Sequence, residues 1–230
     1  MENRISPAFE LLQKDDSDDL RNLLEENPSV SEVTDAGGVS LLMHAIYRGR
    51  LDLAGLISGK KKVLDIFEAA ALGRQDRLQT CLDEDGIGGM SIDSHSSDGF
   101  TALHFACFFR QPEAALLLIE RGAAVDPVAL NPTGVMPLHS AASARNLQAA
   151  RVLLEHGAPV NARQQGGWVP LHAAAQNGDR PMVELLLEHH ADPKLVNDQG
   201  KSSAFVAREK GHPEIAALLE KAAKALILID

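Results

Sequence analysis

Short apolar stretches at helical spacing recur along the chain, separated by polar turns that contain glycine. PLHAAAQNG, residues 170–178, is followed by PMVELLLEHH, residues 181–190, and each stretch places its Leu and Ala residues on one face of a helix. Helices shorter than about 12 residues are marginal in water, so each pair must bury its apolar face against the next pair. The pattern therefore predicts an all-α array of helix-turn-helix units.

A fixed offset links these units. GVMPLHSAA, residues 134–142, and GWVPLHAAA, residues 167–175, agree at their Gly, Pro, Leu, His and Ala positions and lie 33 residues apart. Equivalent phrases follow Gly38 and Gly99, and the long interval between these glycines contains a further unit at residues 65–82. We count seven units, of which the first and last are degenerate, as capping units are.

All seven units belong to one domain, which spans residues 1–230. Unit two is short and is expected to lack a projecting finger before Lys60, whereas unit three is long and residues 83–99 are expected to form an enlarged loop on the binding side. The predicted unit boundaries are 5–35, 36–60, 61–95, 96–130, 131–163, 164–196 and 197–223, followed by an apolar tail at 224–230.

The repeated phrase carries a family resemblance. TALHFA (residues 101–106), PLHSAA (137–142) and PLHAAA (170–175) resemble the T-P-L-H-x-A signature of ankyrin-repeat proteins, whose unit is a β-turn followed by two helices. The resemblance spans roughly residues 8–222 and is strongest in the three central units. It implies an ankyrin-repeat solenoid of stacked helix-turn-helix units joined by β-turn finger loops.

The signature threonine can cap its helix through a side-chain oxygen. Ser40, Thr101 and Ser202 keep that oxygen, whereas Met136 and Val169 have lost it. We therefore expect Val169→Thr to stabilise the array by about 1 kcal/mol.

Ankyrin arrays usually bind partners through turn tips and exposed first-helix positions on their concave face. The aromatic and aliphatic residues among these positions are expected to form one contiguous patch across units three to six, as binding sites often do. A second arrangement stays open, in which Phe108 and Phe109 fold inward beneath the long loop after Leu82. The candidate binding residues are Tyr47, Arg48, Leu72, Phe100, Phe108, Phe109, Val135, Trp168, Gln176 and Asn177.

Charge narrows the class of partner. The formal net charge is −10, and residues 60–62 are the one short basic run, so nucleic acid is not expected as a partner. Acidic residues such as Asp98 and Glu209 favour a basic or amphipathic protein or peptide through electrostatic steering. The sequence contains no stretch of eighteen uninterrupted apolar residues, so it predicts no membrane span.

The two cysteines fall at apolar helical positions, where buried reduced thiols are expected for Cys81 and Cys107. The amino-terminal stretch has acidic residues and no apolar leader segment. These features predict a cytoplasmic location, with a nuclear location left open. The chain is expected to be a monomer.

Catalysis finds no support in the pattern. His104, His139 and His172 occupy the same place in successive units, and packed helices lie about 8–10 Å apart, too far for three nitrogens to share a zinc ion at about 2.0–2.1 Å. The resemblance implies instead that they hydrogen-bond turn and backbone groups. GKSS (200–203) and GIGG (86–89) lack the remaining glycines of phosphate-binding loops. We predict no enzyme activity, cofactor or metal.

The resulting hypothesis is a protein-binding adaptor or scaffold. An inhibitor subunit of an enzyme would use the same surface, and the sequence does not separate the two. A further alternative is a regulatory or structural module that self-associates through the apolar residues 226–229. This tail either folds back onto unit seven or joins two chains, and mass measurement in solution distinguishes these arrangements.

Overall fold

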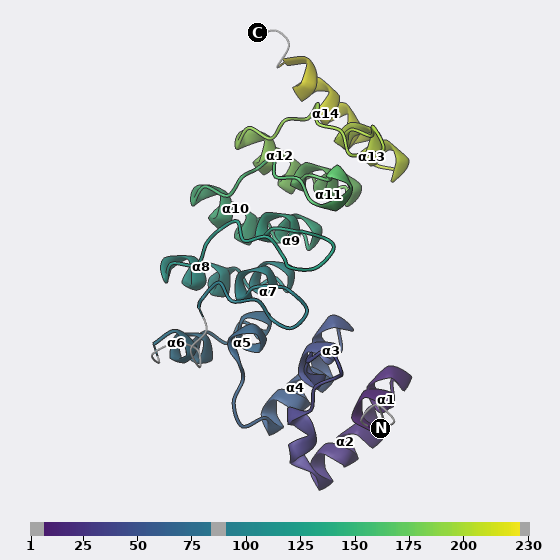
Figure 1. The fold of residues 1–230 in the computed structure, drawn as a ribbon. Coiled ribbons are helices and arrows are strands. Elements are labelled where there is room, and N and C mark those ends of the chain that lie inside the picture. Colours follow the sequence, from purple (N-terminus) through teal and green to yellow (C-terminus); the bar gives the residue numbers. More distant parts are fainter. Residues whose placement is uncertain (1–6, 84–90, 226–230) are drawn as a thin grey trace.

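The computed structural model describes residues 7–83 and 91–225, which form an elongated stack of helix pairs (Figure 1). Fourteen α-helices and no β-sheet occur within these residues. The helices are α1 (Pro7–Lys14), α2 (Ser17–Glu26), α3 (Leu41–Tyr47), α4 (Leu51–Lys60), α5 (Ile66–Leu72), α6 (Gln75–Asp83), α7 (Ala102–Phe108), α8 (Pro112–Glu120), α9 (Pro137–Ser143), α10 (Leu147–Glu155), α11 (Pro170–Gln176), α12 (Arg180–Glu188), α13 (Ser203–Glu209) and α14 (Pro213–Ala225), with short 3-10 helices η1 (Pro28–Glu32) and η2 (Gln165–Gly167).

The turn inside each helix pair is built in the same way seven times. One residue adopts a left-handed conformation, and the next amide N–H donates to the carbonyl five residues before it, as from Asp179 to Ala174 at 3.0 Å. This arrangement satisfies carbonyls that the end of the first helix leaves unpaired. It confirms the turn predicted near Gly178. The left-handed residues are Asp15, Gly49, Gly73, Arg110, Arg145, Gly178 and Gly211.

Small residues allow the pairs to stack closely. Ala106, Ala141 and Ala174 are fully buried in the first helices of neighbouring pairs, and leucines such as Leu118 and Leu153 are fully buried in the second helices. The buried residues form one cluster that follows the stack from α1 to α14 instead of surrounding a single centre. The prediction of an all-α ankyrin-type solenoid is confirmed.

The predicted helix caps are present in part. The Ser40 hydroxyl accepts a hydrogen bond from the Met43 amide at 3.1 Å, and the Ser202 hydroxyl accepts from the Phe205 amide at 3.3 Å. The Thr101 hydroxyl instead lies 2.9 Å from Nδ1 of His104. The oxygen that Thr101 keeps is therefore engaged by the neighbouring imidazole.

The connections before α3, α7 and α13 are turns closed by isolated antiparallel bridges, such as Val196 with Ser202. Between α4 and α5 only residues 61–65 remain, in an extended crossing (Figure 1). Unit two is thus short, as expected. The connection that is shortened lies after Lys60 and not before it, because α4 continues to Lys60. Of the long loop, residues 84–90 lie outside the described residues, as does the tail at 226–230. The exact unit boundaries stay predictions.

Both cysteines occupy the helical core. Cys81 lies in α6 with 3% of its surface exposed, and Cys107 lies in α7 fully buried. Burial raises the pKa of the Cys107 thiol, because the apolar surroundings disfavour the thiolate. These positions agree with the expected buried thiols.

Candidate protein-binding surface

An apolar cavity of about 230 Å³ opens where α3, α7 and α9 approach one another. Tyr47 and Phe108 enter it from the ends of α3 and α7, and Phe100 and Val135 enter it from the turns before α7 and α9. Thr133, Ser140 and Ser143 line the cavity as well, together with His104, His139 and Phe105. The fold therefore brings four of the ten predicted residues to one hollow, which we call the apolar cavity.

Phe105 is the central aromatic residue of this surface. Only 3% of its surface is exposed. Its ring centroid lies 5.7 Å from that of Phe100, 6.4 Å from that of Tyr47 and 6.1 Å from that of Phe67. Phe105 is not among the binding residues predicted from the sequence, although a bulky ring stands there in place of the small residues of the equivalent PLHSAA and PLHAAA phrases.

Phe108 and Phe109 differ in their surroundings. Phe108 is 48% exposed and faces the apolar cavity, so the inward arrangement is wrong for this residue. Phe109 is half-buried, with its ring 5.8 Å from that of Tyr47 and 6.3 Å from that of Phe105. Phe109 thus points inward, and the partners that hold it are aromatic rings of α3 and α7.

The other predicted residues lie apart from the apolar cavity. Leu72 and Phe109 line a second cavity of about 380 Å³ beside α4. Trp168 lines neither of these two cavities, and its ring lies 5.4 Å from that of His172. The apolar residues are therefore divided among three places along the stack and do not line one shared hollow.

Three polar candidates also lie outside the apolar cavity. Arg48 follows Tyr47 at the end of α3 and is exposed, as is Gln176 at the end of α11. The Asn177 amide donates to the Ser143 carbonyl at 3.1 Å and so joins two neighbouring turns. This contact gives Asn177 a role in holding the stack together.

The three signature histidines link successive units. In each, Nδ1 accepts from the backbone N–H at the start of its own helix at 3.2 Å, and Nε2 donates to a carbonyl in the connection that leads to the next helix pair at 3.0 Å. The accepting carbonyls belong to Val135, Ala162 and Lys201, which agrees with the role implied by the resemblance. Within the part of the chain that the structure describes, no cluster of potential metal ligands occurs.

Burial keeps these imidazoles neutral. It lowers the pKa of His104 and of His139 to about 4, and it lowers the pKa of His172 as well. His104 and His139 line the apolar cavity, so their neutral form adds no charge to its wall.

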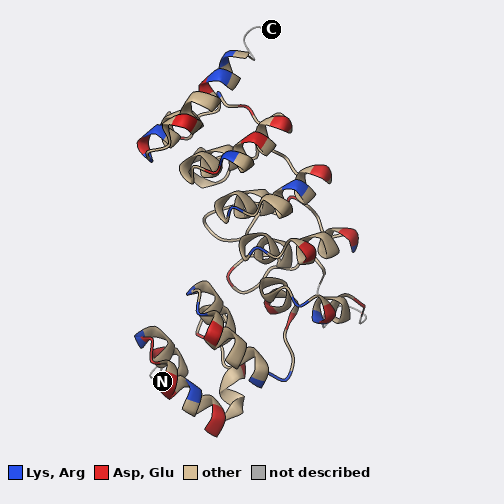
Figure 2. Ribbon diagram, turned by 180° about the vertical axis from the view of Figure 1, so that it is seen from behind, with Lys and Arg blue, Asp and Glu red and all other residues tan. Residues whose placement is uncertain are grey.

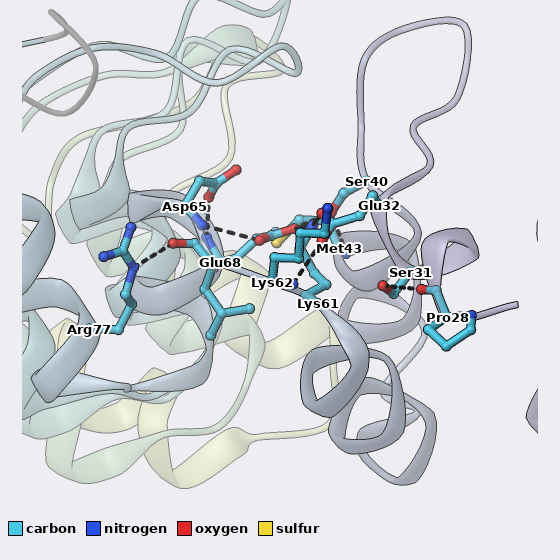
Figure 3. Close-up of polar contacts among 11 residues, drawn as sticks. Pro28, Ser31, Glu32, Ser40, Met43, Lys61, Lys62, Asp65, Glu68 and Arg77 are labelled. Atoms are coloured by element: carbon cyan, nitrogen blue, oxygen red, sulfur yellow. Dashed lines mark hydrogen bonds and ion pairs between the residues drawn. The ribbon is translucent and has the colours of Figure 1, made fainter. Parts of the chain in front are cut away.

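A buried ion pair holds the crossing between α4 and α5 (Figure 3). Glu68 in α5 is 1% exposed, and its carboxylate accepts from the Asp65 amide at 3.2 Å and from the Ser40 hydroxyl at 2.6 Å. Nζ of Lys61 lies 3.0 Å from the same carboxylate. Glu68 takes the place in α5 that His104 takes in α7, because each accepts from the backbone N–H at the start of its helix.

A cavity of about 310 Å³ lies beside this ion pair, and we call it the acidic cavity. Its charged lining comprises the carboxylates Asp65, Glu68 and Asp98 and the ammonium group of Lys61, with His95 nearby. Phe105 lines both the acidic and the apolar cavity. Of these charged residues, Asp98 was predicted from the sequence to favour a basic partner, and Lys61 was noted only within the basic run at residues 60–62.

Charge elsewhere on the array is mixed. Figure 2 shows acidic and basic residues interspersed along the stack, whereas the ribbons of α7, α9 and α11 carry neither type. The Glu209 carboxylate lies 2.8 Å from Nζ of Lys201. The expected steering by Glu209 is therefore weak, because a neighbouring cation balances its charge.

Comparisons with known proteins agree with this geometry. A family model described as ankyrin repeats (many copies) matches residues 66–119 and 138–187. No curated protein matches the chain. None of the helices described here is both long enough and apolar enough to cross a membrane.

Proposed function

Because the chain belongs to the ankyrin-repeat family, whose repeats generally mediate protein–protein interaction, we propose that it is a non-catalytic scaffold or adaptor that binds a protein or peptide. The binding face in this proposal is the concave side of the array, formed by turn tips and first-helix ends. The observation that carries the proposal is the apolar cavity, where two exposed aromatic side chains stand over a buried one. An inhibitor subunit would use the same face.

The exposed rings supply a driving force for association. Tyr47 is 42% exposed and Phe108 is 48% exposed, so each has roughly half of its surface left to bury. Burying a whole aromatic side chain removes about 150–250 Å² from water, worth roughly 4–6 kcal/mol at about 25 cal/mol per Å². Half of that per ring is about 2–3 kcal/mol, so the two rings supply about 4–6 kcal/mol before the cost of association. Micromolar binding corresponds to about 8 kcal/mol, so a partner must bury further surface beside these rings.

The floor of the apolar cavity is held in place by contacts within the chain, which favours binding. Phe105 is wedged among four aromatic neighbours, and His104 is tied to the Val135 carbonyl at 3.0 Å. A partner therefore meets walls that are already ordered, which lowers the entropy cost of association.

Paired affinity capture tests the proposal. The intact chain and a variant with Phe108→Ala and Val135→Ala serve as baits in a lysate of the native organism, and mass spectrometry identifies what each retains. Leu130→Ala is the matched control, because Leu130 is an apolar residue with 74% of its surface exposed and does not line the apolar cavity. Circular dichroism checks that all three baits keep their helical content.

We expect one or more proteins to be retained by the intact chain and the control but lost from the double variant. Identical retention by all three baits would place the contact surface outside the apolar cavity and overturn the proposal.

A further inference from the structure

The apolar and acidic cavities are neighbours. Phe105 lines both, and the Tyr47 hydroxyl, in the apolar cavity, donates to the carboxylate of Asp98, which lines the acidic cavity. One extended segment of a partner can therefore place successive side chains in the two hollows.

The acidic cavity has negative charge that the chain itself does not balance. Its cation, Lys61, is engaged by Glu68 at 3.0 Å and by Glu32 at 3.5 Å. Among residues 7–83 and 91–225, Asp65 and Asp98 form no ion pair with a lysine or arginine. Their hydrogen bonds come from neutral donors: the Glu68 amide at 2.8 Å for Asp65, and the Tyr47 and Ser96 hydroxyls for Asp98.

The pKa of Asp65 also indicates that its negative charge is poorly compensated. Burial, and then the nearby carboxylate of Glu68, raise the pKa of Asp65 above its ordinary value, although Lys61 and hydrogen bonds act in the opposite direction. His95 also lines the cavity, but its Nε2 lies 3.0 Å from the Val128 carbonyl. A cation arriving from a partner would therefore meet carboxylates that still lack one.

The walls suit a long basic side chain. Phe67 and Phe105 line the acidic cavity beside the carboxylates. Lysine and arginine lay their apolar stems along such surfaces while the charged end reaches a polar group.

The apolar cavity has the opposite preference. No lysine, arginine, aspartate or glutamate lines it, and its two histidines are neutral. Its volume of about 230 Å³ exceeds that of an engineered cavity of roughly 150 Å³ that binds benzene. It therefore has room for one aromatic or large aliphatic side chain.

We propose that the partner presents a large apolar side chain close in sequence to a lysine or arginine, with the apolar group in the apolar cavity and the cation at Asp65 and Asp98. This inference rests on the proposed function and specifies the chemistry of the partner segment. The carboxylates of Asp65 and Asp98 favour a basic partner segment over an acidic or uncharged one, because their charge is complementary to it.

Selection from a display library of random peptides tests the inference on the full chain. We expect the selected peptides to share an aromatic or large aliphatic residue near a lysine or arginine. Selection is repeated on a variant with Asp65→Asn and Asp98→Asn, because asparagine removes the negative charge and keeps one acceptor oxygen of nearly the same shape. Glu120→Gln with Glu155→Gln is the control, since it removes two exposed acidic charges from the second helices α8 and α10.

The peptide most enriched on the intact chain is then titrated against each form. It should bind the Asp65→Asn, Asp98→Asn variant about fivefold more weakly and the control as tightly as the intact chain, because partly exposed ion pairs contribute modestly. Raising the salt concentration should weaken binding to the intact chain more than binding to this variant.

Three outcomes separate the inference from the proposed function. Peptides with an apolar residue but no lysine or arginine preference overturn the inference and leave the proposed function standing. A lysine or arginine preference that survives in the Asp65→Asn, Asp98→Asn variant also overturns the inference. Selection that is unaffected by Phe108→Ala with Val135→Ala contradicts the proposed function itself.

Discussion

At the scale of single residues, Phe105 shows how a structural position becomes part of a site. The equivalent places in the regular units hold Ser140 and Ala173, whereas the ring of Phe105 packs against Phe100 and Tyr47 beneath the apolar cavity. A small residue there would leave the two exposed rings without a floor. The repeat therefore keeps its backbone pattern while one enlarged side chain forms the floor of the apolar cavity.

Histidine burial predicts how stability depends on pH. His104 and His139 have folded pKa values of about 4, below the ordinary value of 6.5, so between these values the unfolded chain binds more protons. The free energy of unfolding should therefore fall as the pH falls, by about 2 kcal/mol for each histidine between pH 7 and pH 5. Urea denaturation at the two pH values measures this loss.

His139→Gln is the informative comparison. This variant should lose less stability between pH 7 and pH 5 than the intact chain, by about 2 kcal/mol, because one depressed pKa is gone. Equal losses in both proteins, or a His139 ring that titrates near 6.5 in nuclear magnetic resonance, would contradict the neutral buried imidazole.

At the scale of helices, the repeated turn and the signature phrase were readable from sequence because they depend on local conformation and on apolar spacing. The turn near Gly178 and the expected burial of Cys107 agree with the structure. The buried ion pair of Glu68 was not predicted. Its partner Lys61 lies in the irregular crossing, where no repeat pattern indicates which side chain turns inward.

The buried ion pair in the crossing between α4 and α5 leads to a prediction for the stability of the fold. Lys61→Met should lower the free energy of unfolding by about 3–5 kcal/mol, because it leaves the Glu68 carboxylate buried without its cation. Adding Glu68→Leu should restore much of the loss. Denaturation in urea compares both with Lys62→Met, whose side chain is exposed. Equal effects of Lys61→Met and Lys62→Met would show that the ion pair does not hold the crossing.

The missing cap of α11 provides a second test at this scale. Val169→Thr should raise the free energy of unfolding by about 1 kcal/mol, because the new hydroxyl can reach either the helix backbone or Nδ1 of His172, as Thr101 reaches His104. Val169→Ala, which adds no hydroxyl, is the control. An unchanged or lower denaturation midpoint for Val169→Thr would count against equating Val169 with Thr101.

At the scale of the whole molecule, the stack of helix pairs was predictable from the repeat, but which candidate residues share a cavity was not. Repeat spacing places Tyr47, Phe100, Phe108 and Val135 in turns and helix ends of units two, four and five, and the structure gathers them around one cavity. Leu72 and Trp168 have equivalent places in the repeat yet lie outside it. Side-chain packing between units decides which of these residues line the cavity, and the repeat period alone carries no information about that packing.

The stack also explains how an acidic chain can offer a selective surface. Its net charge is −10, but α7, α9 and α11 carry no lysine, arginine, aspartate or glutamate. Uncompensated carboxylates gather instead at the neighbouring junction, beside the apolar cavity. The long irregular unit between α5 and α7 thus places two kinds of chemistry next to each other.

Site-specific photo-crosslinking tests the central claim most directly. A photoreactive phenylalanine analogue replaces Phe108 at the apolar cavity or, as a control, Leu116 on α8, which is 36% exposed and lies outside that cavity. Each protein is illuminated in a lysate of the native organism. We predict that a partner is crosslinked through position 108 and not through position 116. Crosslinking of the partner through position 116 alone would contradict a binding site on the concave face.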